Sequence, residues 1–489
     1  MTNGNARLSN AGGLRPPYDG AMVLSQAAAA GILLLVVHAG CAAVAACHAL
    51  LTKPDPHSAF GWIMVCWLFP LAGPLLYAVF GINRVRARAK QLRGGLPTFR
   101  DDCRPPDWDE FAAQLTRVGD AVTQWSRIAG NAIEPLENGE NAFPRMLSAI
   151  AAARESVWLT TYIFETDPVG RQFIDALAQA AARGVQVRVL IDGMGEWYTW
   201  PHPVRVLRAA AVRAERFLAP RVLPTPRLAL NMRNHRKLLI ADGQVAFLGG
   251  MNIGGREVGQ AAHRHMADLH FQVRGPIIAQ LARAFAIDWQ FAAREELPAM
   301  PPAAAAGSAV CRVITDGPDE DNDKLLYVIV GALSVARHQI LIMTPYFIPQ
   351  PELTSALQAA ALRGVDVCLV IPERSNLRYV DWASRRWLTP LLERGVRIFL
   401  QPSPFSHTKL LVVDGAYAQI GSANLDPRSL RLNFEIAVEI YCPDTCRPLV
   451  EYVSVAREKS TPYTLELARA QSRASRARNS LVWLLSPYL

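Results

Sequence analysis

One segment of this sequence occurs twice, and the two copies stand 172 residues apart (235 to 407). The first copy reads HRKLLIADGQVAFLGGMNIG (235–254), and the second reads HTKLLVVDGAYAQIGSANLD (407–426). A fixed offset that keeps chemically distinctive residues in register indicates an internal repeat. The residues paired by this offset are His235 with His407, Lys237 with Lys409, Asp242 with Asp414, and Asn252 with Asn424.

A second pair of matching segments precedes these copies. Residues 157–192 and 340–373 each contain an apolar β-rich run, an Ala/Leu-rich helical run, the tripeptide Arg-Gly-Val and another apolar run. Gly184 and Gly364 follow the helical runs, where glycine commonly ends a helix. Strand, helix and strand at this spacing predict a βαβ unit with parallel strands. We therefore predict an α/β fold in which two tandem repeats, 135–305 and 306–489, form one pseudo-symmetric catalytic unit.

Within each copy, His and Lys are two residues apart, so they project from the same face of an extended segment. Asp-Gly is a turn signal, and the strand that follows it returns the Asn of each copy to the level of His and Lys. A single His-x-Lys would be read as surface residues on an edge strand. Two copies in one register, each within a repeated frame, indicate a functional site instead.

The N-terminal part has the composition of a membrane segment. Residues 20–52 and 56–83 contain no Asp, Glu, Lys or Arg, and each run exceeds the ~20 residues that cross a bilayer as a helix. A transmembrane helical hairpin is predicted over 21–83, after an N-terminal tail (1–20). Pro70 and Pro74 interrupt the second run, which leaves kinking or partial insertion open.

A basic linker, 84–134, follows the predicted hairpin. Its first residues, NRVRARAKQLR, carry five positive charges within eleven positions. Such a cluster marks the cytoplasmic side of a membrane and attracts anionic lipid. The remaining chain is therefore expected on the cytoplasmic side.

Charge and cysteine content limit the chemistry. The net charge of +9 suits an anionic partner, whether nucleic acid, anionic lipid or a phosphate substrate. The eight scattered cysteines predict free thiols in a reducing compartment. There is no Gly-rich phosphate loop and no His/Cys set with metal-ligand spacing, so neither a metal nor a cofactor is expected.

The repeated residues suit a phosphate diester. Lys237 and Lys409 supply compact positive charges, while Asn252, Asn424 and Ser422 supply neutral donors that would bind the substrate. One imidazole can attack phosphorus and form a phosphohistidine. The other can protonate the leaving oxygen and then deprotonate the incoming alcohol or water.

The paired HxKx4D motifs resemble the phospholipase D superfamily, and the resemblance covers roughly 135–455. Within this superfamily, the chain most resembles bacterial cardiolipin synthases. The similar segments, from both inside and outside that range, are GWIMVCWLFPLAGPLLYAVFGINR, TTYIFETD, GGMNIG, TPYFIP, GSANLDPRSLRLNFE and LLSPYL. The resemblance implies that both motifs form one metal-free site, with His235 as nucleophile and His407 as acid/base. The symmetry of the motifs leaves the reverse assignment open. Asp242 and Asp414 belong to the catalytic motif, but they begin tight turns, and the family resemblance gives them a structural role.

Two further acids are candidates for orienting the imidazole rings. Asp268 and Glu435 lie 33 and 28 residues after the motif histidine of their own repeat. A carboxylate on the far ring nitrogen fixes the tautomer and raises the basicity of the imidazole.

The resemblance implies transfer of a phosphatidyl group from one phosphatidylglycerol to another, which releases glycerol. The expected partners are phosphatidylglycerol and anionic membrane lipid, at the cytoplasmic face of a bacterial inner membrane that the chain crosses more than once. No nucleic acid is expected, and the oligomeric state stays open. The alternatives are a phospholipase D that hydrolyses or uses another lipid, a nuclease of the same chemistry, and a non-enzymatic scaffold, against which two complete motifs argue.

Overall fold

The computed structural model describes residues 18–53, 55–81, 110–123, 125–218, 232–259, 265–318 and 323–486. The chain divides into two compact units, residues 1–84 and 85–489. Most of the linker predicted at 84–134, including its basic cluster, lies outside the described residues.

The N-terminal unit holds one helix long enough to cross a bilayer. Within α1 (Tyr18–Thr52), the 25 residues Ala28–Thr52 have a mean hydropathy of 2.2. The second apolar run is broken into α2 (Pro56–Leu68), α3 (Ala72–Leu76) and the π-helical turn η1 (Tyr77–Gly81). At 1.5 Å per residue, the 13 residues of α2 span only about 20 Å, less than the ~30 Å hydrocarbon core.

The interruption that Pro70 and Pro74 left open is present in the described residues, and a second membrane span stays a prediction. Pro70 is the physical reason, because proline has no N–H for the helical ladder and its ring clashes with the preceding turn. The helix restarts beyond Leu71, whose φ is 56°. The two arms still pack against each other through Ala42, Ala45, Ala49, Cys66 and Tyr77.

The catalytic unit is built from two copies of one α/β arrangement. The first copy comprises β1 (Ile128–Glu137), α6 (Asn138–Ala152), β2 (Ser156–Thr161), α7 (Pro168–Ala182), β3 (Gln186–Asp192), η2 (Gly195–Tyr198), α8 (Pro203–Ala209), β4 (Ala214–Phe217), β5 (Arg233–Asn234), β6 (Leu238–Ala241), β7 (Val245–Gly249), η3 (Gly255–Glu257), β8 (Met266–Ala267), β9 (Leu269–Arg274) and α10 (Ile278–Ala293).

The second copy repeats this order almost element for element. It comprises β10 (Ala309–Asp316), α11 (Lys324–Val335), β11 (Gln339–Met343), α12 (Pro351–Leu362), β12 (Asp366–Pro372), α13 (Arg378–Leu392), β13 (Arg397–Gln401), β14 (Phe405–Ser406), β15 (Leu410–Val413), β16 (Tyr417–Gly421), α14 (Pro427–Arg431), β17 (Asn433–Tyr441) and α15 (Pro443–Glu458). Outside the repeated order lie α5 (Glu110–Val122), β18 (Thr461–Pro462), α16 (Leu465–Arg469) and α17 (Arg473–Trp483).

The two copies share one continuous sheet, in the order β18-β13-β12-β11-β15-β16-β17-β10-β1-β9-β7-β6-β2-β3-β4. The strand order of one half mirrors that of the other about the antiparallel pair β1 and β10. β2 pairs with β3, and β11 with β12, in parallel, as the repeated βαβ pattern predicts. The predicted hairpins are also present, since β6 pairs antiparallel with β7 and β15 with β16.

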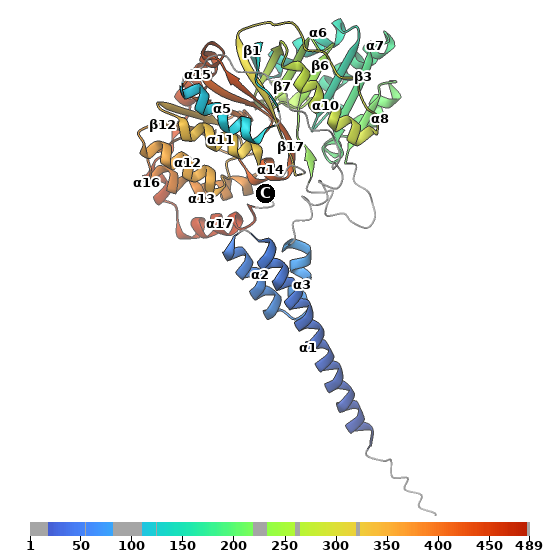
Figure 1. Cartoon of the computed structure of the whole chain (residues 1–489), viewed down its shortest axis with the longest axis vertical. Coiled ribbons are helices and arrows are strands. Elements are labelled where there is room, and N and C mark those ends of the chain that lie inside the picture. Colours follow the sequence, from blue (N-terminus) through green and yellow to red (C-terminus); the bar gives the residue numbers. More distant parts are fainter. Residues whose placement is uncertain are drawn as a thin grey trace, which may run out of the picture. The chain divides into compact units, whose positions relative to one another are not determined.

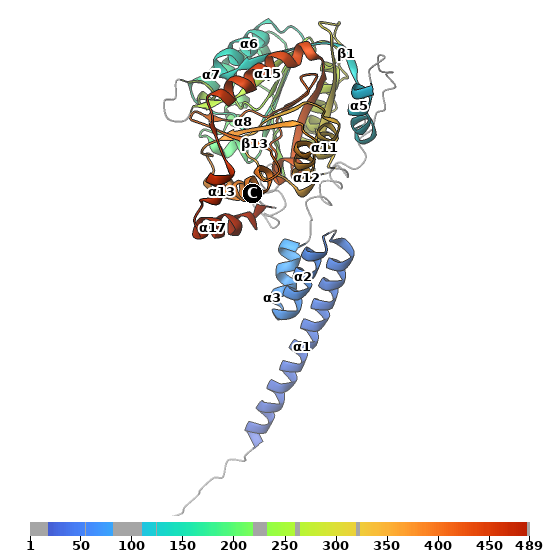
Figure 2. The same ribbon diagram turned by 90° about the vertical axis from the view of Figure 1, so that its left-hand side faces the viewer.

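Helices cover both faces of the sheet (Figures 1 and 2). On one face, buried residues of α10 and α15 join strands of both halves in a single core. On the other face, α6, α7 and α8 cover the first half and α11, α12 and α13 the second, each over its own core. This shared core fixes the two halves against each other, which positions the residues between them.

Candidate active site

The two motif segments each pair with the opposite repeat. β5, which immediately precedes His235, runs parallel to the start of β17. β14, which precedes His407, runs parallel to β8. The N–H of His235 donates to the carbonyl of Phe434 at 3.0 Å, and the N–H of His407 donates to that of Ala267 at 2.7 Å.

Because each motif segment pairs with the opposite repeat, each motif histidine lies beside an acid of the other repeat. We call these two contacts the crossed histidine–acid pairs. Nδ1 of His235 lies 2.9 and 3.1 Å from the two carboxylate oxygens of Glu435. Nδ1 of His407 lies 3.0 Å from Oδ2 of Asp268. The two acids predicted to orient the rings do contact them, and each contacts the histidine of the other repeat. With Nδ1 engaged, Nε2 is the nitrogen that each ring can offer to a substrate.

Both acids are fully buried and held in place by neighbours. Glu435 accepts hydrogen bonds from the Ser422 hydroxyl and from Nδ2 of Asn433, at 3.1 Å for the latter. Asp268 accepts from the N–H of Leu269 at 2.7 Å. The Ser422 hydroxyl is thus committed to Glu435, which corrects its predicted role as a substrate donor.

The two lysines lie inward beside the histidines. Nζ of Lys237 donates to the carbonyl of His235 at 2.7 Å, and Nζ of Lys409 donates to the carbonyl of His407 at 2.5 Å. Burial lowers the pKa of Lys237 to about 7 and that of Lys409 to about 8. Burial also lowers the pKa of each motif histidine to about 4, so both imidazoles are neutral at neutral pH while the lysines carry the positive charge.

This charge distribution predicts a pH-dependent anion site. Sulfate keeps its charge over the whole range, so its affinity should be nearly constant from pH 5 to 6 and fall as pH rises through the lysine pKa values of about 7 and 8. The inhibition constant of sulfate as a competitive inhibitor, determined at each pH, measures this affinity. Lys237→Arg should remove the lower step, because arginine stays protonated. Affinity that is unchanged up to pH 9.5 would contradict charged lysines as the anion ligands.

The predicted asparagine donors differ from each other. Oδ1 of Asn252 accepts from the N–H of Ile163 at 3.1 Å, which directs its NH₂ group the opposite way. Nδ2 of Asn424 donates to the Ser429 hydroxyl at 3.1 Å. Asn252 therefore has the geometry of an anion donor, whereas the NH₂ group of Asn424 is already engaged.

Tyrosine rings flank both histidines. The Tyr162 ring meets His235 edge-on at 5.3 Å and lies 5.5 Å from Nζ of Lys237. Tyr346 meets His407 edge-on at 6.3 Å. These rings shield the imidazoles from water on one side.

Two residues that hold the site residues in place were not predicted from the sequence. Glu257 is fully buried, its Oε1 accepts from the N–H of Asn252 at 3.3 Å, and burial together with Asp268 raises its pKa to about 8. Arg236 forms a buried ion pair with Asp288 at 2.8 Å and donates Nε to the carbonyl of Glu435 at 3.0 Å. No motif pointed to either, because both differ from the aligned residues of the second repeat, Ser429 and Thr408.

The motif aspartates lie at the opposite end of the strand from the histidines, so they are not part of the reacting group of side chains. Asp242 adopts a φ of 50° at the β6–β7 turn, and its carboxylate accepts three backbone N–H groups of residues 154–156 at 2.8 Å each. Asp414 repeats this arrangement with the N–H groups of residues 337–339.

Asp242→Asn should lower the free energy of unfolding by about 2 kcal/mol, because hydrogen bonds to a charged acceptor are lost while the turn itself tolerates Asn. Denaturant unfolding measures it, and kcat per folded molecule should stay within about twofold. Asp414→Asn is the matched variant, and the exposed Asp175→Asn in α7 is the control. Wild-type stability with no turnover would place Asp242 in the chemistry instead.

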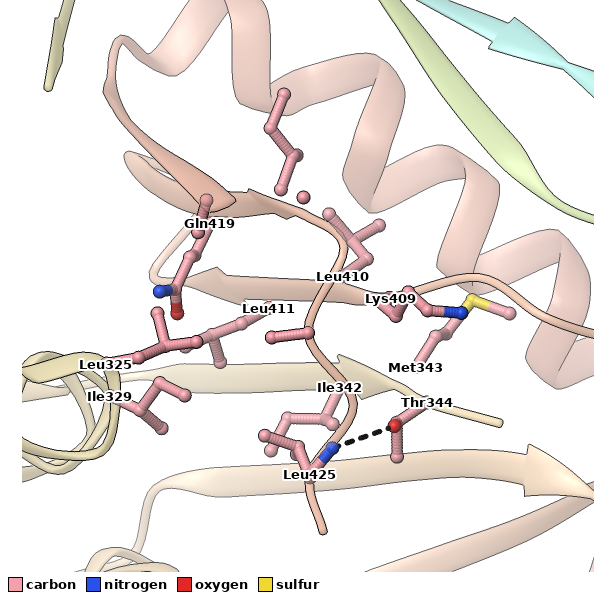
Figure 3. A pocket seen from close by; sticks show the side chains of 14 residues that line it. Leu325, Ile329, Ile342, Met343, Thr344, Lys409, Leu410, Leu411, Gln419 and Leu425 are labelled. Carbon is pink, nitrogen blue, oxygen red and sulfur yellow. Dashed lines mark hydrogen bonds between the residues drawn. The ribbon is translucent and has the colours of Figure 1, made fainter. Parts of the chain in front are cut away.

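A small apolar pocket adjoins Lys409 between α11 and strands β11, β15 and β16. Figure 3 shows aliphatic side chains around it, with the Leu425 N–H donating to the Thr344 hydroxyl oxygen at 3.3 Å. Its volume is about 40 Å³, well below the ~300–1,000 Å³ of small-molecule sites. This pocket therefore cannot take up an acyl chain.

The site can perform metal-independent nucleophilic displacement at phosphorus, since it offers a neutral imidazole, a second imidazole for proton transfer and two cations. Within the described ranges, no three His, Cys, Asp or Glu side chains gather in a way that could hold a metal ion. The duplicated α/β sheet and the two histidine–acid pairs, each formed between the two repeats, are the features of phosphodiester-cleaving enzymes whose active site is assembled from two repeated halves.

Comparison with known proteins identifies the family within this class. The family model described as cardiolipin synthase, PLD-like domain, matches residues 146–289 and 329–454, and the phospholipase D-nuclease N-terminal model matches 41–81. The chain belongs to the phospholipase D-like cardiolipin synthase family.

Relatives match along most of the chain. It is 30% identical to a cardiolipin synthase of Oceanobacillus iheyensis over 90% of its own length and 95% of the relative's. It is 32% identical to cardiolipin synthase A of Pseudomonas aeruginosa, over 91% and 94%. Among solved structures, phosphatidylserine synthase of Haemophilus influenzae matches with a TM-score of 0.58 and 15% identity, over 77% of this chain and 100% of that one. The last match supports the fold alone.

Proposed function

We propose that this protein is a membrane-associated phosphatidyltransferase that makes cardiolipin and glycerol from two molecules of phosphatidylglycerol. The observation that carries the proposal is the pair of crossed histidine–acid contacts beside two buried lysines, in a chain of the cardiolipin synthase family. The enzyme class and phospholipid substrates follow from the family. The roles of His235 and His407 are those that the family resemblance implies, and we propose them for this chain.

The first half of the reaction forms a phosphohistidine. Nε2 of His235 attacks the phosphorus of the donor, and the bond from phosphorus to the glycerol headgroup oxygen breaks. His407 gives a proton to that oxygen as glycerol leaves. Glu435 at Nδ1 keeps His235 in the tautomer with a free Nε2 lone pair and stabilises the cationic phosphohistidine.

The second half reverses these roles. A headgroup hydroxyl of the second phosphatidylglycerol loses its proton to His407, attacks phosphorus, and displaces Nε2 of His235. Lys237, Lys409 and the NH₂ group of Asn252 stabilise the charge on the non-bridging oxygens in both steps. The binding of an anionic diester also raises the pKa of the nearby imidazoles, which favours the protonated acid that the first step requires.

Exclusion of water decides between transfer and hydrolysis. Only 12% of the His235 side chain and 8% of the His407 side chain are exposed. A site this enclosed favours a lipid hydroxyl over water as the second nucleophile. Hydrolysis to phosphatidic acid is the second candidate activity.

We further infer that α1 anchors the chain in the inner membrane and that residues 135–305 and 306–489 act as one catalytic domain at the cytoplasmic face. The broken second arm, α2 and α3, is proposed to return the chain to the side from which α1 enters.

A lipid product assay tests the proposed function. The full-length protein, purified in detergent, receives phosphatidylglycerol, and the products are separated by chromatography. Cardiolipin and glycerol in equal amounts are expected, with neither formed by His407→Ala. Phosphatidic acid without cardiolipin would overturn transfer in favour of hydrolysis, and no product from any phospholipid would overturn the proposal as a whole.

A further inference from the structure

A rigid loop beside the active site carries three exposed aromatic side chains. Trp197, Tyr198 and Trp200 are 65, 59 and 76% exposed. They lie in the segment that follows β3, at the carboxyl edge of the parallel strands. Isolated surface hydrophobics are ordinary in soluble domains, but three large aromatics within four positions are a concentrated apolar feature.

The loop is fixed by buried polar contacts, so its exposure is not the result of a loose segment. Oδ1 of Asp192 accepts the N–H groups of Met194 and Gly195 at 2.9 Å each. Buried Glu196 is bound by Arg216, with one contact at 2.9 Å. At Gly195 a Cβ atom would lie 1.7 Å from the carbonyl oxygen of Tyr162, so the loop packs directly against the strand end.

Ring contacts connect this loop to the reacting group. Tyr198 meets Tyr162 at 6.1 Å, and Tyr162 meets His235 at 5.3 Å. Tyr198 therefore stands one ring beyond the ring that covers the first histidine, and Trp197 and Trp200 are its near neighbours in the same loop.

The second half of the site has an apolar and basic counterpart in α17. Val482 and Trp483 of this helix pack against the same small core of Ile348, Val380 and Ala383 as Tyr346, whose ring meets His407. Leu481 of this helix and Leu484 and Leu485, which directly follow it, are 67, 64 and 56% exposed. The helix lies beside α13 in both views (Figures 1 and 2).

Charge favours an anionic partner for this face. Residues 473–486 contain three exposed arginines (Arg473, Arg476 and Arg478) and no acid. Between β12 and the first residue of α13 there is one exposed acid, Glu373, against two exposed arginines, Arg374 and Arg378. Aromatic side chains with basic neighbours are the composition of surfaces that lie in the headgroup region of anionic membranes.

We propose that residues 195–200 and the outward face of α17 form a docking rim that enters the headgroup layer of an anionic bilayer around the mouth of the active site. The rim holds the site against the membrane, so a phosphodiester headgroup reaches His235 while its acyl chains stay in the bilayer. The small volume of the pocket beside Lys409 agrees with this, since that pocket cannot receive a chain. The role in substrate supply rests on the proposed function, whereas membrane contact does not.

Membrane contact is tested first, without reference to activity. The full-length protein and Trp197→Ala/Trp200→Ala are reconstituted in phosphatidylglycerol vesicles with lipids brominated near the top of the acyl chain. The emission of Trp197 and Trp200 is obtained by subtracting the fluorescence of the variant from that of the wild type. We expect the bromine atoms to quench this difference signal strongly. If this difference signal is as bright as in unbrominated vesicles, the rim does not enter the membrane and the proposal is overturned.

Substrate supply is tested by comparing two forms of phosphatidylglycerol. With long-chain lipid in vesicles, Trp197→Ala/Trp200→Ala should lose about tenfold or more in kcat/KM, mainly through a higher surface KM. With short-chain lipid dissolved in detergent, it should stay within about twofold of wild type. Leu362→Ala is the control, because Leu362 is 66% exposed but ends α12 at the opposite edge of the sheet, so both activities should be unchanged.

Each other outcome has a definite meaning. If the double variant lost kcat/KM equally with both substrates, the mutation would have damaged the active site itself. If it lost no kcat/KM with vesicles, the rim would not contribute to catalysis at the membrane. Either outcome would overturn the role of the rim in substrate supply. Dimer formation that depends on Trp197 and Trp200 would assign the surface to a second copy instead. A wild-type protein that is inactive with both lipids would overturn the proposed function, and bromine quenching alone would then decide whether the rim enters the membrane.

Discussion

His235→Ala and His407→Ala should each lower kcat for phosphatidylglycerol by about 10⁴-fold or more, since removing one member of a cooperating catalytic pair removes nearly the whole effect. The two variants should differ when the leaving group needs no proton. With a phosphatidyl ester of p-nitrophenol, His407→Ala should release one nitrophenolate per enzyme molecule and then stop, because the phosphohistidine forms but no base activates the acceptor. His235→Ala should show no such burst.

The comparison decides the roles as well as the mechanism. A burst from His235→Ala but not from His407→Ala would exchange nucleophile and acid/base. A burst from both, or full turnover by either variant, would contradict a mechanism that needs two histidines. Unchanged thermal unfolding of both variants serves as the control for folding.

Glu435→Gln should lose about 10³–10⁴-fold in kcat, because an amide at Nδ1 cannot stabilise the cationic ring and can hold the wrong tautomer. Because Glu435 contacts His235, this variant should show no burst with the p-nitrophenyl ester. Asp268→Asn should show the burst and then stop, since Asp268 contacts His407.

In the burst assay, each acid variant should therefore behave like the alanine variant of the histidine that belongs to the other repeat. A burst from Glu435→Gln, together with none from Asp268→Asn, would contradict the crossed arrangement. A double variant, His235→Ala with Glu435→Gln, should lose little more than His235→Ala alone, because the two residues act as one unit.

Much of this arrangement was accessible from the sequence because it depends on local pattern. The repeated βαβ units, the Asp-Gly hairpins and the matching motif positions all follow from residues close together in the chain. The position of Asp242 in a tight turn was also predictable, since an Asp-Gly turn favours positive φ, but the amides of residues 154–156 that it binds are distant in the sequence.

The exchange between repeats was not accessible in this way. Glu435 and His235 are 200 residues apart, and nothing in either motif encodes which copy supplies the acid. The exchange arises because β5 and β14 each pair with a strand of the opposite repeat, β5 with β17 and β14 with β8 in a separate two-stranded sheet. Ser422 was misassigned for a related reason, since its hydroxyl is satisfied by an acid whose position only the tertiary fold defines.

The second apolar run shows a different limit. Its composition satisfies the length for a membrane span and its prolines left a kink open, but neither feature predicts that α2 ends at Leu68 and α3 begins at Ala72. The described helix α2 is too short to cross a bilayer by itself.

The stereochemistry at phosphorus tests the central claim most directly. The substrate is phosphatidylglycerol with an isotopically chiral phosphorus, and the configuration is read from the product after one transfer. Two successive displacements, first by His235 and then by the acceptor hydroxyl, predict overall retention. Inversion would mean a single direct displacement and would contradict the phosphohistidine, and with it the role assigned to the crossed histidine–acid pairs.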